Sequence, residues 1–195
     1  MTKNSYQKCM DWTERNIGIG SVRLMVRALT AVTAAIYCVM AAFLLVGRDG
    51  RLIRFILVPA VGFVIVTLFR KVVGAKRPYE IYDLTPLLNK DTKANSFPSR
   101  HVFSNMIIAA AVFWINLPLG IATGSCGVAL AVFRVITGVH FPKDVAAGAV
   151  IAVLFGWIGF YLIALCGTSE TGNMLISYIY ENPFLTYLYE NNLIV

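Results

Sequence analysis

The sequence predicts an all-α fold, a bundle of helices that span a membrane. Hydrophobic residues make up 58% of the 195 residues and charged residues only 14%, and the mean hydropathy is +0.71. These values lie far outside the usual composition of a soluble domain. Several apolar runs are long enough to cross a bilayer, which takes about 20 helical residues. Because such spans use most of the chain, we expect residues 1–195 to form a single membrane-embedded domain.

Five apolar runs are predicted to be spans, and a short helix is predicted before them. Residues 1–20 mix charges with Met10 and Trp12, which predicts an amphipathic helix at the membrane interface. Pro118 and Gly120 predict a tight turn between the third and fourth spans. The predicted spans cover residues 22–46, 52–73, 100–117, 121–135 and 144–166.

Two segments outside the spans have different predicted roles. Residues 74–99 are rich in charge and proline, which predicts a long polar loop of the kind that is usually functional. The tail, residues 167–195, has three glutamates and no lysine or arginine; we expect an interfacial helix there, with a sixth span as the alternative. Loops 74–99 and 136–143 are separated by two spans, so both should emerge on one face and build one site.

The charge pattern favours a lipid or phosphate partner over nucleic acid. The net charge is +7, but the basic residues flank apolar runs or lie in the polar loop, as expected for contacts with anionic lipid. The four cysteines show no CxxC spacing, so we expect no disulfide framework and no cysteine-bound metal. The expected partners are the bilayer and a lipid phosphate, with no cofactor and no nucleic acid. The oligomeric state is not predicted.

The sequence has two histidines, His101 and His140, and each adjoins a predicted helix end at the shared face. Asp144 follows His140 by four residues, either one helical turn away or at a helix start. In both geometries its carboxylate can accept the Nδ1 proton of His140, which leaves Nε2 as a nucleophile. A helix cap is the alternative role for Asp144, and the two roles are compatible.

The segment SFPSRH places Ser99 as the expected N-cap of the third span. A helix N-terminus carries unpaired amides and partial positive charge, which suit a phosphate oxygen. Ser99 can add its hydroxyl and Arg100 its amide. His101, in the first turn, is then placed to protonate a departing alcohol oxygen.

The segment RKVVGAKRP, residues 70–78, ends the second span with four cations. For Lys71 and Lys76, ordinary anchoring of a helix end at the membrane surface is an equally good explanation. Arg77 differs because it precedes a proline that ends the helix, and its planar guanidinium suits bidentate contact with a phosphoryl group.

These three blocks together resemble the signature of the type 2 phosphatidic acid phosphatase superfamily, which includes the vanadium haloperoxidases and bacterial undecaprenyl pyrophosphate phosphatases. The family pattern reads K-x6-R-P, then P-S-G-H, then S-R-x5-H-x3-D. The matching residues here, in the same order, are Arg77, Pro78, Pro98, Ser99, His101, Arg134, His140 and Asp144.

The resemblance implies a metal-independent membrane lipid phosphatase. His140 would form a phosphohistidine, His101 would act as the acid, and Asp144 would orient His140. The family usually places its site on the external or periplasmic face, and we expect the same here. The distribution of charged residues around the predicted spans favours the alternative, a cytoplasmic site. The residues that the resemblance assigns to phosphate binding are Arg70, Lys71, Arg77, Ser99, Arg100 and Arg134.

Three positions depart from the family pattern. Arg70 stands where the spacing asks for lysine, and its two-turn separation from Arg77 gives it a better direction than Lys71. Arg100 replaces the glycine of P-S-G-H, and we hypothesise that it contacts a second phosphate or a charged head group. Phe133 replaces the serine before Arg134, which removes a hydroxyl from that block.

Two other function classes are weighed against the phosphatase. One is a lipid-binding or flipping protein without enzyme activity that uses the same cationic pocket. The other is a haem protein with His101 and His140 as axial ligands. Neither explains the spacing of Arg134, His140 and Asp144. Within the phosphatase class, the sequence does not distinguish phosphatidic acid, phosphatidylglycerol phosphate and undecaprenyl pyrophosphate as substrates.

Overall fold

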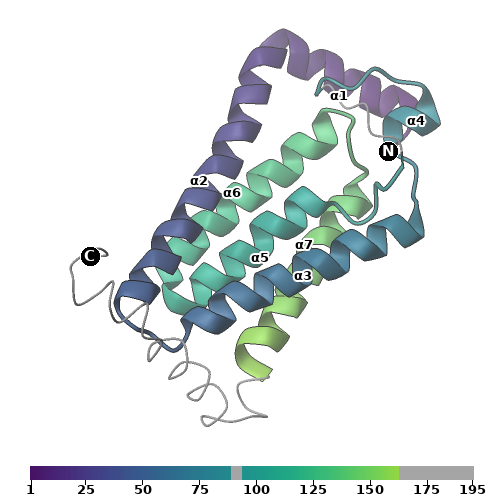
Figure 1. Ribbon diagram of the computed structural model, residues 1–195. Coiled ribbons are helices and arrows are strands. Elements are labelled where there is room, and N and C mark those ends of the chain that lie inside the picture. The colour runs from purple at the N-terminus through teal and green to yellow at the C-terminus, as the bar shows by residue number, and fades with distance from the viewer. Residues whose placement is uncertain (89–93, 163–195) are drawn as a thin grey trace.

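The computed structural model describes residues 1–88 and 94–162, and this part of the chain is built from helices without strands (Figure 1). The helices are α1 (Lys3–Asn16), α2 (Ile19–Val46), α3 (Leu52–Val73), α4 (Pro78–Tyr82), α5 (Arg100–Ile115), α6 (Leu117–Ile136), α7 (Pro142–Trp157) and η1 (Ile158–Leu162). The last of these, η1, is a short π-helix that continues α7.

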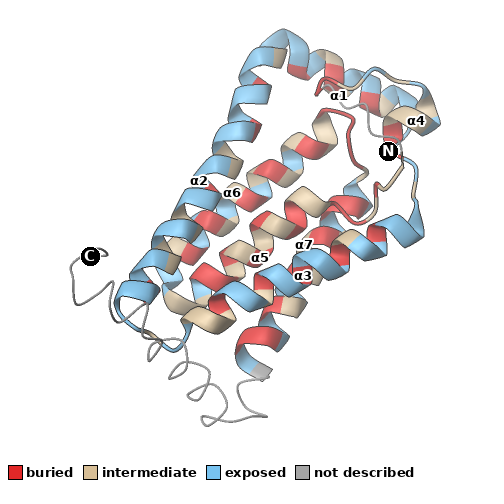
Figure 2. Ribbon diagram, viewed as in Figure 1, coloured by how far each residue is buried: buried red, intermediate tan, exposed pale blue. Residues whose placement is uncertain are grey.

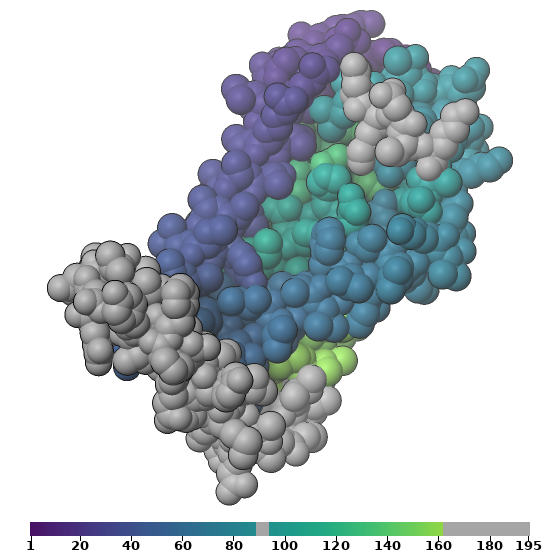
Figure 3. Space-filling model, in the orientation of Figure 1, coloured from purple at the N-terminus to yellow at the C-terminus, as the bar shows by residue number. Residues whose placement is uncertain are grey.

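Helix α5 forms the centre of the bundle. It packs against α6, α7 and α3, while α2 lies along α6 (Figure 1). Most of its side chains are therefore buried or half-buried, whereas α2 and α3 expose many large apolar side chains (Figure 2). Figure 3 shows atoms of α5 and α6 at the surface between α2 and α3. Apolar surface on the outer helices is the arrangement expected of a bundle that is surrounded by lipid.

The predicted all-α membrane fold is confirmed. Four helical segments within the described residues are long and apolar enough to cross a membrane, and α5, with 16 residues, is shorter. The second predicted span coincides with α3 at both ends. The described residues of the predicted polar loop include the short helix α4. The predicted tail helix and sixth span, residues 167–195, lie outside the described residues.

The predicted turn at Pro118 and Gly120 is wrong, because both residues lie inside α6. Asn116 caps this helix by accepting a hydrogen bond from the Leu119 amide over 2.9 Å. Proline is well tolerated in a first helical turn, where its missing N–H has no helical partner to lose. A Cβ atom on Gly120 would lie 2.2 Å from the Cα atom of Phe113. The glycine therefore allows α5 and α6 to approach closely.

The two polar connections lie at one end of the bundle. The segment between α4 and α5 and the segment between α6 and α7 meet where α1 crosses that end (Figure 1). Both connections contain buried residues, in contrast to the exposed turn between α2 and α3 (Figure 2). The fold thus brings together the residues that the sequence singled out.

Candidate active site

His140 lies in a buried chain of hydrogen bonds with Ser96 and Asp144. His140 and Ser96 are 0% exposed, and Asp144 is 1% exposed. The Ser96 hydroxyl donates to Asp144 Oδ2 over 2.5 Å and lies 3.3 Å from His140 Nδ1. The direct distance from His140 Nδ1 to Asp144 Oδ2 is 3.6 Å, which is too long for a good hydrogen bond.

Ser96 therefore connects the imidazole to the carboxylate. Its single hydroxyl proton goes to Asp144, so its oxygen is left to accept the Nδ1 proton of His140. This arrangement assigns the proton to Nδ1 and leaves Nε2 as the basic nitrogen. Sequence reasoning gave the orienting contact to Asp144 alone and missed Ser96.

The backbone after α6 determines where His140 lies relative to that helix. After α6 ends, Gly138 takes a left-handed conformation with φ of +74°, which turns the chain back. The His140 amide then donates to the Arg134 carbonyl over 3.0 Å. Asp144 Oδ2 accepts a hydrogen bond from the Phe141 amide over 3.1 Å at the start of α7. Asp144 thus accepts a capping bond at the start of α7 and also the hydrogen bond from Ser96.

The N-terminus of α5 contacts Asp144. Ser99 is the N-cap residue, as predicted, but its side chain makes no capping bond. Its amide instead donates to the Asp144 carbonyl over 2.8 Å. A Cβ atom on Gly148 of α7 would lie 2.7 Å from the Ser99 carbonyl oxygen. Gly148, which sequence reasoning also missed, is what allows α7 to approach the start of α5 so closely.

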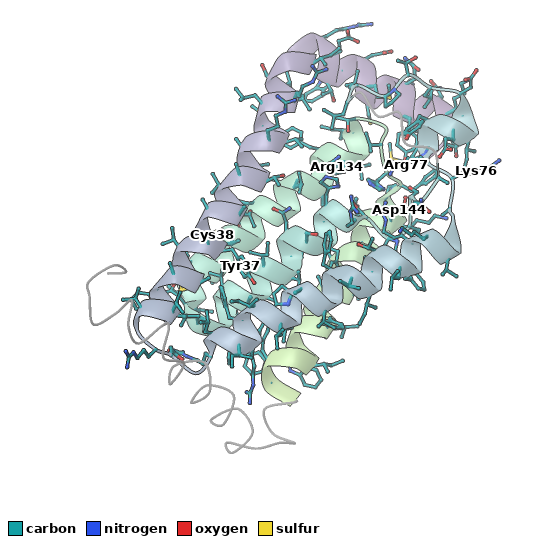
Figure 4. All side chains as sticks on the ribbon, viewed as in Figure 1. Tyr37, Cys38, Lys76, Arg77, Arg134 and Asp144 are labelled. Carbon is teal, nitrogen blue, oxygen red and sulfur yellow. The ribbon has the colours of Figure 1, made fainter. Side chains whose placement is uncertain are left out.

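Three buried arginines surround this cluster from three different segments: Arg70 from α3, Arg77 before α4, and Arg134 from α6. Figure 4 shows Arg77, Arg134 and Asp144 converging, while Lys76 points outward. Three donor atoms around this cluster are buried and have no hydrogen-bond partner within the described residues: Arg77 Nη1, Arg134 Nε and Ser99 Oγ. Buried polar groups are normally paired, so these atoms suit an anionic ligand.

The side chains of Arg70 and Lys71 point to different sides of α3. Arg70 is buried, and its guanidinium donates to the Pro98 carbonyl over 2.6 Å and to the Asn95 carbonyl. Lys71 is exposed. Arg70 thus faces the site and holds the segment that carries Ser96, which a lysine with one nitrogen would do less completely.

Glu80 holds the two ends of the polar loop together, a role that sequence reasoning did not identify. Its carboxylate accepts hydrogen bonds from the Arg77 amide over 2.8 Å and from the Ala94 amide over 3.0 Å. The Arg77 Nε atom donates to the Ala94 carbonyl over 3.2 Å. These bonds fix a backbone in which Ala94 and Asn95 both have positive φ. The loop is thereby closed next to Ser96.

The remaining predicted residues occupy different surroundings. His101 is half-buried in the first turn of α5. The Arg100 guanidinium lies 5.5 Å from the Phe63 ring centroid on α3; its contact with a second phosphate stays a prediction. Phe133 packs with the apolar cluster around Val22 and Leu130. The residue that replaces the family serine therefore contributes to the contact between α2 and α6.

The described residues contain no group of three or more His, Cys, Asp or Glu side chains that could hold a metal ion. The site brings together an imidazole, a carboxylate, a helix N-terminus and several guanidinium groups. These groups have the chemistry that is suited to an oxyanion ligand.

A family model and a curated relative match this chain. The family model described as "PAP2 superfamily" matches residues 51–167. The "Bacitracin transport permease protein BcrC" of Bacillus licheniformis is 32% identical over 98 residues, 48% of this chain and 48% of that protein. The matched segment thus spans about half the length of this relative.

A solved structure has a similar fold. It is the crystal structure of the first transmembrane PAP2-type phosphatidylglycerolphosphate phosphatase from Bacillus subtilis. The TM-score is 0.50, with 17% sequence identity, over 85% of this chain and 95% of that chain. At this identity the similarity concerns the fold alone.

Proposed function

The chain belongs to the PAP2 superfamily, and we propose that it is a multi-pass membrane phosphatase that removes a terminal phosphate from a lipid through a phosphohistidine on His140. One observation carries the proposal. The buried chain from His140 through Ser96 to Asp144 lies among buried donors of Arg77, Arg134 and Ser99 that have no partner in the described part of the protein. This arrangement supports a role for His140 as a nucleophile beside an anion-binding site.

In the first step, the Nε2 lone pair of His140 attacks phosphorus, and the bond from phosphorus to the lipid oxygen breaks. His101 gives its proton to the departing oxygen. Arg77, Arg134 and the Ser99 hydroxyl bind the phosphoryl oxygens, and their positive charge and hydrogen bonds stabilise the transition state. Asp144 acts through Ser96 to stabilise the positive charge that develops on His140.

In the second step, a water molecule attacks phosphorus and gives a proton to His101. The bond from phosphorus to Nε2 breaks, and its electron pair returns to His140. Inorganic phosphate leaves, and both histidines regain their starting protonation. Because arginines supply the positive charge, the reaction needs no metal ion, and activity should persist in a chelator.

The substrate is a lipid with a terminal phosphate, whose chains remain in the bilayer while the head group reaches the helix ends. Phosphatidic acid, phosphatidylglycerol phosphate and undecaprenyl pyrophosphate all meet this description. Following the family, we assign the site to the external or periplasmic face. Arg70 and Arg100 add charge around the phosphate position, and Arg100 is the candidate for a second phosphate.

The test compares purified His140→Ala with wild type and with Lys76→Ala, in a phosphate-release assay over the three lipids. Lys76 is the matched control, because it is an exposed cation beside the site (Figure 4). We expect H140A to release no phosphate above background on any substrate and K76A to behave like wild type. Wild-type release by H140A would overturn the proposal. A binding or flipping protein would instead be inactive throughout, with lipid translocation intact in H140A.

A further inference from the structure

Helix α1 packs directly on the turn that carries His140. Its buried side chains are Tyr6, Met10 and Thr13, which share one face at helical spacing. The helix lies outside residues 51–167, the segment that the family model matches. The proposed catalytic histidine is therefore supported by a part of the chain that the family pattern does not include.

Tyr6 is the centre of this contact. Its ring is 0% exposed, and its hydroxyl donates to the His140 carbonyl over 3.2 Å. The ring meets Phe141 edge-on at 5.9 Å between centroids and lies 6.0 Å from the Tyr82 ring on α4. Burial raises the pKa of Tyr6, so the phenol keeps its proton and remains a donor. One side chain thus joins α1 to both polar connections.

Met10 lies one helical turn after Tyr6 in α1 and contacts the same segment before His140. Gly138 has a φ of +74°, and a Cβ atom placed on it would lie 2.8 Å from the Met10 sulfur. The methionine therefore covers the glycine that reverses the chain toward His140. Tyr6 and Met10 together restrain the turn on both sides of Val139.

We propose that Tyr6 is a positioning residue for the phosphatase reaction, which holds the His140 backbone so that the imidazole meets phosphorus at a productive angle. The inference rests on the proposed role of His140 as the nucleophile. Small errors in orientation reduce rates strongly, but the loss of one hydrogen bond loosens the turn without breaking it. We therefore expect Tyr6→Phe to reduce kcat roughly fivefold, the equivalent of one net hydrogen bond.

The experiment compares Y6F with Y37F. Tyr37 on α2 is a matched control, because its hydroxyl donates to the Phe55 carbonyl over 2.9 Å and its ring stacks on Phe55. It lies far from Arg77 and Asp144 in Figure 4. Both variants lose a hydroxyl bonded to a backbone carbonyl, so both should lower the Tm similarly. Only Y6F should lower kcat, with KM unchanged, and Met10→Ala should lower kcat in the same direction.

The results distinguish the positioning role of Tyr6 from the proposed phosphatase function. Equal kcat values in Y6F, Y37F and wild type would overturn the positioning role, as would a change in KM with kcat intact. Activity in H140A would overturn the proposed function itself. A normal kcat in Y6F beside an inactive H140A overturns only the role of Tyr6.

Discussion

The arginines at the two ends of the bundle differ in how their charge is balanced. Between α2 and α3, Arg51 pairs with Asp49 over 2.6 Å, and the arginine side chain is 48% exposed. This contact lowers the pKa of Asp49, mainly through the hydrogen bond from Arg51. At the other end, Arg77 and Arg134 are buried, and neither forms an ion pair with a carboxylate among residues 1–88 and 94–162.

This difference teaches which cations serve the fold and which serve a ligand. An exposed local pair contributes little to stability, but it leaves no charge uncompensated. A buried cation without a carboxylate costs free energy. Since such cations lie at one end of the described bundle, we propose that a bound anion balances their charge there. Three comparisons, from the largest expected effect to the smallest, test this account.

The largest effect is expected for Arg134→Met, compared with Arg51→Met. R134M removes a buried donor from the proposed phosphate site, so kcat/KM should fall by about 10²–10³, the usual effect of losing one such donor. R51M should leave kcat/KM unchanged. Thermal unfolding should show R134M at least as stable as wild type, because the substitution removes an uncompensated buried charge. Similar activities in the two variants would contradict the contrast between the two ends.

The second comparison concerns how closely α7 approaches α5. Gly148→Ala places a Cβ atom 2.7 Å from the Ser99 carbonyl oxygen, so the start of α5 must shift away from Asp144. A displacement of about 1 Å costs on the order of 100-fold in rate. Gly20→Ala is the control, because no atom lies within 4 Å of its added Cβ. If G148A turned over lipid as fast as G20A, the close helix contact would have no part in catalysis.

The third comparison separates Ser96 from Asp144. Ser96→Ala should reduce kcat by about tenfold, because a hydrogen bond to a charged group is lost. Asp144→Asn should cost more. The double variant should be no slower than D144N alone, since both residues act through one chain of bonds. Rates that multiply in the double variant would show that Ser96 acts independently of Asp144.

Most of the fold follows from local sequence. The apolar run of α3 is bounded by a polar turn before Leu52 and by Gly74, whose φ of +56° ends the helix, and both signals are visible in the sequence. The error at Pro118 has a physical reason, since proline suits a turn and a first helical turn equally well. Helical direction also favoured Arg70 over Lys71, and Arg70 is the buried residue of the two.

The contacts that the sequence could not predict join distant positions. The spacing of Arg134, His140 and Asp144 is local, so it could be recognised. The contact of Ser96 with His140 spans 44 positions, and that of Tyr6 spans 134. The amphipathic pattern of α1 predicted a helix with one apolar face, but such a pattern does not specify whether protein or lipid covers that face. Part of the apolar face of α1 covers the turn that carries His140. The location of α1 at the membrane surface stays a prediction.

The most direct test of the account is to trap the covalent intermediate. Wild type would be mixed with lipid labelled in its terminal phosphate, quenched during turnover, and digested to locate the label. We expect phosphate that is stable to base and labile to acid on the peptide containing His140, formed at the rate of turnover and absent in H140A. Label on another residue, or full turnover with no protein-bound phosphate, would contradict the assignment of His140 as the nucleophile.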